Sequence, residues 1–325
     1  MRIRVEVFRG ERLESRHQVD FAVADSRERS TASGGERVFL RSAAKPFQAA
    51  AIVASGALDD LDSGDEMIAI VAASHSGETK HTSLVARLLS RIGLDESALR
   101  CGAHPPFHAE AAAQLGAAVS PLHHNCSGKH AGMLAVARQL GVPAASYLDA
   151  DGPVQGLMRR TVAAACGLMA EEVVVATDGC GAATFAIPLG QAAGAFALLA
   201  QPREAPDELR EPLERVAAAM ARHPDLIGGT GRFDTRLMDG TRARLLAKGG
   251  AEGVQGIADR LSGSGMCLKV RDGAARAVAP ATLEALRAAG WVGDEMLRAL
   301  DDLWHPAITN YCGAQVGRID TKEED

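Results

Sequence analysis

Strand-like segments stand at both ends of this 325-residue chain, and a long helical stretch separates them. Residues 2–8 alternate apolar and polar side chains, and residues 17–24 follow after a polar turn, which predicts a hairpin. Residues 244–248 and 266–270 predict two more antiparallel strands, and residues 279–303 predict one or two closing helices. Because a strand must pair its backbone groups, the two chain ends are expected to share one sheet.

The middle of the chain predicts helices. Four helices are expected over residues 81–92, 109–118, 154–166 and 207–222. Another is expected to begin in the segment 123–130 and run through Leu140, and a further one to follow the break at 177–181 and end at about Ala200. Periodicity does not distinguish strand from helix for the apolar run 67–73, and residues 223–235 predict a Gly-rich loop.

Residues 1–325 are therefore expected to form a single α/β domain with two lobes. The α/β lobe would comprise approximately residues 1–60 and 240–325, and the mainly helical lobe approximately residues 75–225. No internal repeat or long linker divides the chain further.

Composition and charge favour a small molecule as the partner. A net charge of −6 and a pI near 5.9 offer no basic face for nucleic acid. No apolar run approaches the roughly 20 residues of a membrane span, and the start MRIRVEVFRGERLESR lacks the apolar core of a secretory signal. A cytoplasmic location without membrane association is expected, and the six cysteines are expected as free or metal-bound thiols.

The segment RSAAKPFQAA, residues 41–50, places Ser42 three residues before Lys45. One interpretation is structural: Ser42 caps an alanine-rich helix that has Pro46 in its first turn. The other is catalytic, because side chains at i and i+3 share a helix face and a desolvated lysine can take a proton from a serine. Penicillin-binding proteins and serine β-lactamases use this spacing with a second serine motif and a late Lys-x-Gly.

Both of those further elements are present. Ser74 lies in SHSGE after the apolar run, and Lys248 lies in LAKGG at the end of a predicted strand. The structural alternatives are a polar loop and a solvated lysine. The bare backbone at Gly249 and Gly250 is expected to let a substrate approach the strand edge.

Two more motifs, HHNCSGKH and TDGCG, contain Cys126, Lys129 and Cys180. An inert buried thiol is the alternative for either cysteine. Neither a Cys-x-x-Cys pair nor HExxH occurs, so a standard zinc signal is absent. Gly128-Lys129 is not a P-loop, because the preceding glycine and the following Ser or Thr are missing.

Six motifs thus follow one another between about residues 41 and 254: RSAAKPFQ, ASHSGE, HHNCSGKH, TDGCG, GGTGRFDT and LAKGGAEGV. Together they resemble the rhizobial-type L-asparaginase family, which contains zinc and Ser–Lys tandems. The resemblance implies a fold similar to serine β-lactamases and serine-type glutaminases, a homodimer, and hydrolysis of L-asparagine to L-aspartate and ammonia.

The resemblance also implies roles for particular residues. The two Ser–Lys tandems would be Ser42 with Lys45 and Ser74 with Lys248. The Zn²⁺ site would comprise the following residues: Cys126, Lys129 and Cys180, with Asp178 nearby. A lysine ligand must be neutral, so the metal would have to displace its proton. Zinc would tune substrate affinity without supplying a hydroxide, because a serine nucleophile is already present.

The expected chemistry is amide hydrolysis through an acyl-enzyme. Ser42 would attack the side-chain amide carbon, Lys45 would take its proton, and backbone N–H groups would hold the oxyanion. Arg41 is the candidate for binding the substrate α-carboxylate, with a surface arginine as the alternative. His130 is a further candidate for substrate contact, with a packed histidine as the alternative.

Two other functions are alternatives. One is a serine glutaminase or β-lactamase-like hydrolase of the same fold, and the other is a non-catalytic, metal-stabilised sensor of a small molecule. The remaining cysteines are expected to be packed thiols without metal: Cys101, Cys166, Cys267 and Cys312.

Overall fold

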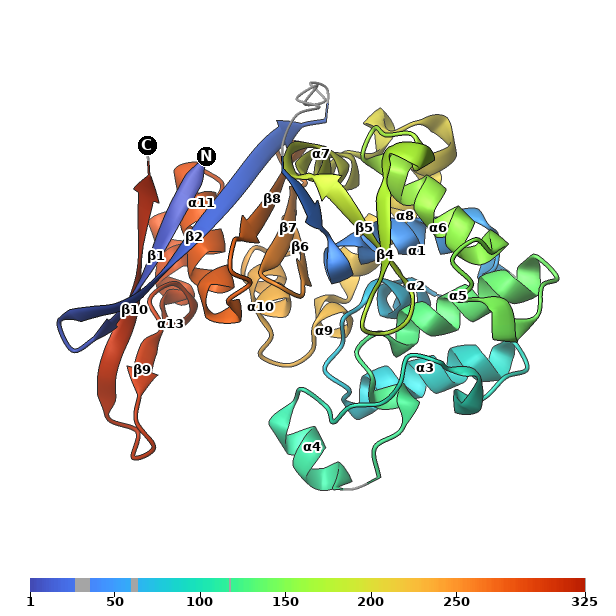
Figure 1. Cartoon of the computed structure of the whole chain (residues 1–325), viewed down its shortest axis with the longest axis horizontal. Helices are drawn as coiled ribbons and strands as arrows, with labels where there is room; N and C mark the ends of the chain where they lie inside the picture. Colours follow the sequence, from blue (N-terminus) through green and yellow to red (C-terminus); the bar gives the residue numbers. More distant parts are fainter. Residues whose placement is uncertain (27–35, 60–63, 117, 325) are drawn as a thin grey trace.

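The computed structural model describes residues 1–26, 36–59, 64–116 and 118–324. A large antiparallel sheet occupies one side of the molecule, and most helices gather on the other side around a smaller sheet (Figure 1). The α/β class predicted from the sequence is confirmed. The specific likeness to serine β-lactamases stays a prediction.

The large sheet combines both chain ends, as predicted. Among the described residues it has seven strands in the order β6-β7-β8-β2-β1-β10-β9. Its strands are β1 (Arg2–Arg9), β2 (Arg12–Asp25), β6 (Leu245–Gly250), β7 (Val254–Asp259), β8 (Ser264–Val270), β9 (Ala307–Thr309) and β10 (Gln315–Glu324). β1 pairs with β2 on one side and with β10 on the other, so the marked chain ends lie near each other in Figure 1.

Three strands of this sheet were not predicted. The predicted strands at 244–248 and 266–270 exist as β6 and β8, but they do not pair with each other because β7 lies between them. Gly256 interrupts the apolar pattern of β7, so the sequence did not indicate a strand there. The glycine is required because a Cβ at this position would lie 1.9 Å from the Phe196 ring. β9 is short and β10 is rich in charge, so neither shows an apolar pattern.

Helix α7 (Leu189–Ala200) covers β8 and β7 of the large sheet. The contact is close because β8 has Gly265 there: a Cβ would lie 2.1 Å from Ala197 N and 2.2 Å from Ala193 O. The sequence predicted one apolar helix after residue 181, but strand β5 (Ala183–Pro188) comes first. Pro188 ends this strand and is the N-cap of α7.

The smaller sheet has the order β3-β5-β4 among the described residues. It joins β3 (Arg37–Phe39) and β4 (Val174–Thr177) to β5. The TDGCG motif forms the turn between β4 and β5, where Asp178 N donates to Ala182 O at 2.8 Å. This small sheet therefore presents the Cys180 turn to the helical lobe.

The helices of the middle region agree broadly with the prediction. They are α1 (Lys45–Ala54), α2 (Asp65–Ala72), α3 (Thr79–Arg91), α4 (Ala109–Leu115), α5 (Ser127–Gln139), α6 (Pro153–Ala165) and α8 (Asp207–Arg222). The ambiguous run 67–73 is helical, as α2. The predicted loop 223–235 instead contains α9 (Pro224–Ile227) and the start of α10 (Phe233–Gly240).

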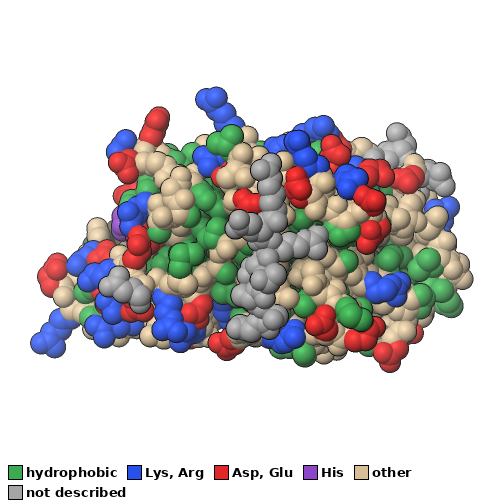
Figure 2. Space-filling view, turned by 90° about the horizontal axis from the view of Figure 1, so that it is seen from above, with side chains coloured by type: hydrophobic (Ala, Val, Ile, Leu, Met, Phe, Trp, Pro, Cys, Tyr) green, Lys and Arg blue, Asp and Glu red, His purple; other side chains and the backbone are tan. Residues whose placement is uncertain are grey.

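The C-terminal region supplies α11 (Val278–Ala288), α12 (Asp294–Ala299) and α13 (Asp301–Trp304), where one or two helices were predicted. No helix in the described ranges is long and apolar enough to cross a membrane. Acidic and basic side chains intermingle on the face shown in Figure 2.

Candidate active site

Ser42 lies in a tight turn immediately before α1. The turn is a 3₁₀ helix, Arg41–Ala44, and Arg41 has φ of 49°, a left-handed conformation that a residue with a side chain rarely adopts. The Ser42 hydroxyl is half-buried and makes no hydrogen bond within the described ranges. The capping interpretation is wrong, because Ala44 is the N-cap of α1. Ser42 therefore keeps a free hydroxyl.

Lys45 lies at the start of α1 with 1% of its surface exposed. Its Nζ donates to Ala73 O at 2.7 Å, Ser74 Oγ at 3.0 Å and Asn125 O at 3.2 Å. Burial is the main cause that lowers the pKa of Lys45 below its ordinary value, and the Cys126 thiolate opposes the shift. This amine links α1, the end of α2 and the segment before α5.

Ser74 lies just after α2, where the backbone at Ala73 becomes extended. Its N–H donates to Ile227 O at 2.9 Å, so the SHSGE loop is fixed to the last residue of α9. Two further contacts strengthen this connection: Ser76 Oγ donates to Gly228 O at 2.8 Å, and Thr230 Oγ1 donates to Glu78 Oε2 at 2.7 Å.

Lys248 lies on β6 with no exposed surface. Its Nζ donates to Gly249 O at 2.6 Å and lies 3.8 Å from Asp234 Oδ2. Burial lowers the pKa of Lys248 to about 7, although the Asp234 carboxylate opposes this shift. A lysine with that pKa exchanges a proton near neutral pH.

The hydrogen bonds pair these groups differently from the implied tandems. The structure joins Lys45 to Ser74, and within the described ranges it records no hydrogen bond between Ser42 and Lys45 or between Ser74 and Lys248. Hydrogen bonds in an unliganded active site are often long and tighten when substrate binds. The roles of the four residues stay predictions.

Gly250 brings β6 against the Ser42 turn. A Cβ at this position would lie 2.5 Å from Leu40 O and 3.2 Å from Ala43 N. The Gly249 N–H is also occupied, because it donates to Asp234 Oδ2 at 2.8 Å. The two glycines thus admit other parts of the chain, and the approach of a substrate to this strand edge stays a prediction.

The two cysteines of the implied metal site meet between α5 and the β4–β5 turn. Cys126 is the N-cap of α5, and its thiol hydrogen-bonds the thiol of Cys180. The hydrogen bond from Cys180 is the main cause that lowers the pKa of Cys126 well below its usual range, while the same bond raises the pKa of Cys180. Without metal, Cys126 is therefore the thiolate of the pair, and Cys180 keeps its proton.

Lys129, one turn along α5, completes this cluster. Its Nζ donates to Cys180 Sγ at 3.1 Å. Burial acts to lower the pKa of Lys129, but the nearby Cys126 and Cys180 sulfur atoms outweigh it and raise the pKa above its ordinary value. Without metal, this lysine is held as an ammonium.

Asp178 and Arg41 pair with each other. Arg41 Nη2 and Nε donate to the same oxygen, Asp178 Oδ1, at 2.8 Å and 3.2 Å. This bond is the main cause that raises the pKa of Arg41. Asp178 is therefore engaged by an arginine through one of its two carboxylate oxygens, and its place in the implied metal site stays a prediction.

Two thiols and one amine converge, which fits three of the four ligands of a tetrahedral zinc site. No cluster of three His, Cys, Asp or Glu side chains suited to a metal occurs in the described ranges. The fit of zinc thus depends on Lys129 as the third ligand.

His130 is fully buried beside Lys129. Its Nδ1 shares a hydrogen bond of 2.8 Å with the Tyr147 hydroxyl, and its Nε2 has no partner within the described residues. Burial is the main cause that lowers the pKa of His130 well below its usual range. With no exposed surface, this side chain has no direct substrate contact available in this conformation.

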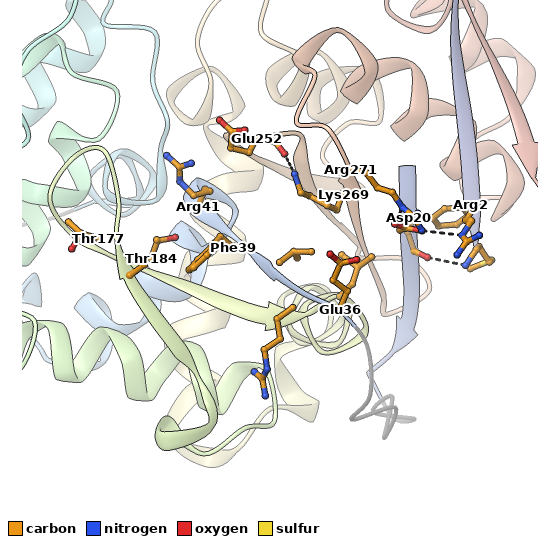
Figure 3. A pocket seen from close by; sticks show the side chains of 16 residues that line it. Arg2, Asp20, Glu36, Phe39, Arg41, Thr177, Thr184, Glu252, Lys269 and Arg271 are labelled. Carbon is orange, nitrogen blue, oxygen red and sulfur yellow. Dashed lines mark hydrogen bonds and ion pairs between the residues drawn. The ribbon is translucent and has the colours of Figure 1, made fainter. Parts of the chain in front are cut away.

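A cavity of about 1000 Å³ extends from Arg41 toward β2 and β8 (Figure 3). Arg41 and Glu252 lie at one end, and Asp20 with Arg2 and Arg271 lies at the other. None of the candidate serines and lysines lines it, but Arg41, the residue next to Ser42, does.

Asp234 is a residue of this region that the sequence reasoning missed. It lies in the quoted motif GGTGRFDT, but an aspartate in the first turn of a helix is ordinarily a capping residue. Only the tertiary structure reveals that it faces Lys248.

The two candidate serines and their two lysines, Lys45 and Lys248, supply two buried amines, one free hydroxyl and one hydroxyl already bound to an amine. This combination suits nucleophilic attack on a carbonyl with a lysine as the base. A family model described as L-asparaginase II matches residues 5–321. No curated protein matches the chain.

Proposed function

The chain belongs to the L-asparaginase II family, and from that premise we propose that it hydrolyses L-asparagine to L-aspartate and ammonia with Ser–Lys chemistry. The observation that carries the proposal is the buried Lys45 amine, 3.0 Å from Ser74 Oγ and one helical turn from the free Ser42 hydroxyl. A buried amine of lowered pKa is the base that a serine nucleophile requires.

Ser42 is proposed as the nucleophile because its hydroxyl is half-buried and free, whereas Ser74 is buried and bonded to Lys45. The Ser42 Oγ attacks the side-chain amide carbon, and its proton passes to neutral Lys45. The C–N bond then breaks, and ammonia leaves with a proton returned through Lys45 and Ser74. Water hydrolyses the resulting ester, which releases L-aspartate and restores the serine.

Lys248 and Ser74 are proposed to help this proton transfer. Lys248 is buried near Lys45, whose charge contributes to lowering the pKa of Lys248. In this proposal a neutral Lys248 accepts a proton when water attacks the ester, and Ser74, bonded to Lys45, passes the proton on.

The proposed ligands of Zn²⁺ are Cys126, Cys180 and Lys129. When bound, the metal would supply a fixed positive charge that favours an anionic group of the substrate. Cys126 and Cys180 must then both be thiolates, and Lys129 must lose the proton it holds in the metal-free cluster.

Arg41 is proposed to bind the substrate α-carboxylate. Its guanidinium is partly exposed, and the side chain lines the cavity (Figure 3). Asp178 orients it through one oxygen, so further guanidinium N–H groups stay available for a carboxylate. A homodimer and a cytoplasmic location are further proposals, and the homodimer rests on the family resemblance.

The test combines ammonia release with labelling. Wild-type protein is assayed with L-asparagine, L-glutamine and a chromogenic β-lactam, which distinguishes an asparaginase from a glutaminase, a β-lactamase and a non-catalytic sensor. The protein is then treated with 5-diazo-4-oxo-L-norvaline, a reactive analogue of asparagine, and its peptides are mapped by mass spectrometry. We expect the label on Ser42 and no turnover in folded Ser42→Ala. A label on Ser74 would make Ser74 the nucleophile and Lys45 its direct base.

A further inference from the structure

Asp234 occupies the space between α10 and the hairpin that carries Lys248. Its Oδ2 accepts from Gly249 N at 2.8 Å, and its Oδ1 accepts from Gln255 Nε2 at 2.9 Å. Gly249 and Gln255 face each other across the β6–β7 pair. One carboxylate therefore binds both strands at the position where the lysine side chain leaves the sheet.

The same carboxylate is the acidic group that faces the lysine. Lys248 Nζ lies 3.8 Å from Asp234 Oδ2, and the lysine has no exposed surface. Only 12% of the Asp234 side chain is exposed, so solvent screens the pair weakly.

We propose that Asp234 is the positioning residue of Lys248: it holds the Gly249 backbone N–H next to the lysine and the Gln255 side chain on β7, and it supplies the negative charge that the buried amine faces. This inference rests on the proposed function, in which Lys248 exchanges a proton during hydrolysis. Asp234 itself does not contact the substrate in this scheme.

The charged groups around Lys248 act on its pKa in opposite directions, so the contribution of Asp234 can be distinguished from the others. Lys45 from α1 and Arg232 from the segment before α10 disfavour the ammonium form of Lys248, and Cys126 from the start of α5 favours it. Asp234 is the largest of the charges that favour the ammonium, and it opposes the effect of burial. Its removal leaves a lysine that loses its proton more easily.

Asp234→Asn removes the negative charge and keeps groups that can form the two hydrogen bonds. Asparagine keeps one oxygen acceptor for Gly249 N–H, and a flip of the Gln255 amide restores the second hydrogen bond. Asp234→Ala removes both functions. Asp239→Asn is the matched control, because Asp239 is an exposed aspartate on the same helix.

The experiment measures two titrations in each variant. The first is the pH dependence of kcat/KM for asparagine. The second is an NMR titration of the chain labelled with ¹³C and ¹⁵N at the lysine side chains, with the Lys248 resonance assigned by its loss in Lys248→Met. We expect Asp234→Asn to move both midpoints about one pH unit lower, since an opposite charge at this distance shifts a pKa by at least that amount.

Asp239→Asn is expected to leave both midpoints unchanged, and Asp234→Ala is expected to lower kcat as well. An unmoved Lys248 midpoint in folded Asp234→Asn overturns the proposal. Asp234→Ser, smaller and uncharged, gives the same decision where the asparagine variant does not fold. Wild-type protein without ammonia release would refute the proposed function alone, since the NMR midpoint still decides the role of Asp234.

Discussion

At the residue scale, burial determines the chemistry of the two candidate lysines. Lys45 and Lys248 both have their ammonium groups removed from water, which lowers the pKa of each. They differ in their neighbours: Lys45 donates to three oxygen atoms, whereas Lys248 donates to one carbonyl and faces a carboxylate. Two similar side chains are thus suited to separate proton transfers.

Ser74 and Lys248 are predicted to act as one unit. Replacing either by alanine should lower kcat by about 10²–10⁴, the typical contribution of acid–base groups. The double variant should be little worse than the worse single variant, because groups that act together are not additive. Steady-state kinetics of the three folded variants measures this, and losses that multiply would contradict a shared role.

Zinc binding should depend on Cys126 and Cys180 alone among the cysteines. Elemental analysis of protein purified without chelator should find zinc, and Cys126→Ala should lose it. Removing the metal should raise KM more than it lowers kcat, since uniform binding is lost while the serine and lysines remain.

Cys312→Ser is the control for that measurement, and its metal content should match that of the wild type. The structure corrects one expectation here: Cys312 is exposed, whereas Cys101, Cys166 and Cys267 are buried as predicted. Zinc-free wild-type protein would contradict the metal assignment.

The motifs indicated the residues of the candidate site, but they did not indicate which of these side chains contact each other. Short spacings such as Ser42-x-x-Lys45 are local, so the sequence displays them. The contact from Lys45 to Ser74 and the one from Asp234 to Lys248 join distant segments. Those depend on how α1, α2, α10 and β6 pack, which no local pattern records.

At the element scale, glycines mark the places where backbone meets backbone. Gly265 and Gly256 let α7 lie directly on β8 and β7, and Gly250 lets β6 reach the Ser42 turn. The same glycines weaken the apolar alternation by which strands are identified, and this explains why β7 was not predicted. Periodicity identified most helices because each has one buried face.

Gly265→Ala should destabilise the protein. The added Cβ would lie 2.1 Å from a backbone nitrogen of α7, so the helix must move away from the sheet at a cost of about 1–3 kcal/mol. Gly194→Ala on α7 is the matched control, because no atom lies within 4 Å of its added Cβ. The free energy of unfolding of the Gly194→Ala variant should stay unchanged or rise by up to ~1 kcal/mol, because alanine has the higher helix propensity. Urea unfolding measures both, and equal midpoints would contradict this account.

At the scale of the whole molecule, the prediction of a sheet shared by both chain ends is confirmed by the pairing of β1 with β10. The prediction of a homodimer concerns the assembly and is tested directly. Sedimentation velocity should give a mass about twice that of the 33.9 kDa chain. A single species at the chain mass across the micromolar range would contradict it.

The pairing of β1 with β10 also sets an order of events during protein synthesis. A ribosome makes the β1–β2 hairpin roughly 300 residues before it reaches β10, which takes about 15–60 s at ordinary elongation rates. Throughout that time one side of β1 has no strand to pair with, and the nascent chain depends on chaperones or on its own charged residues to keep that edge from other chains. The centre of the sheet is therefore completed only when β10 has been made, long after β1 and β2.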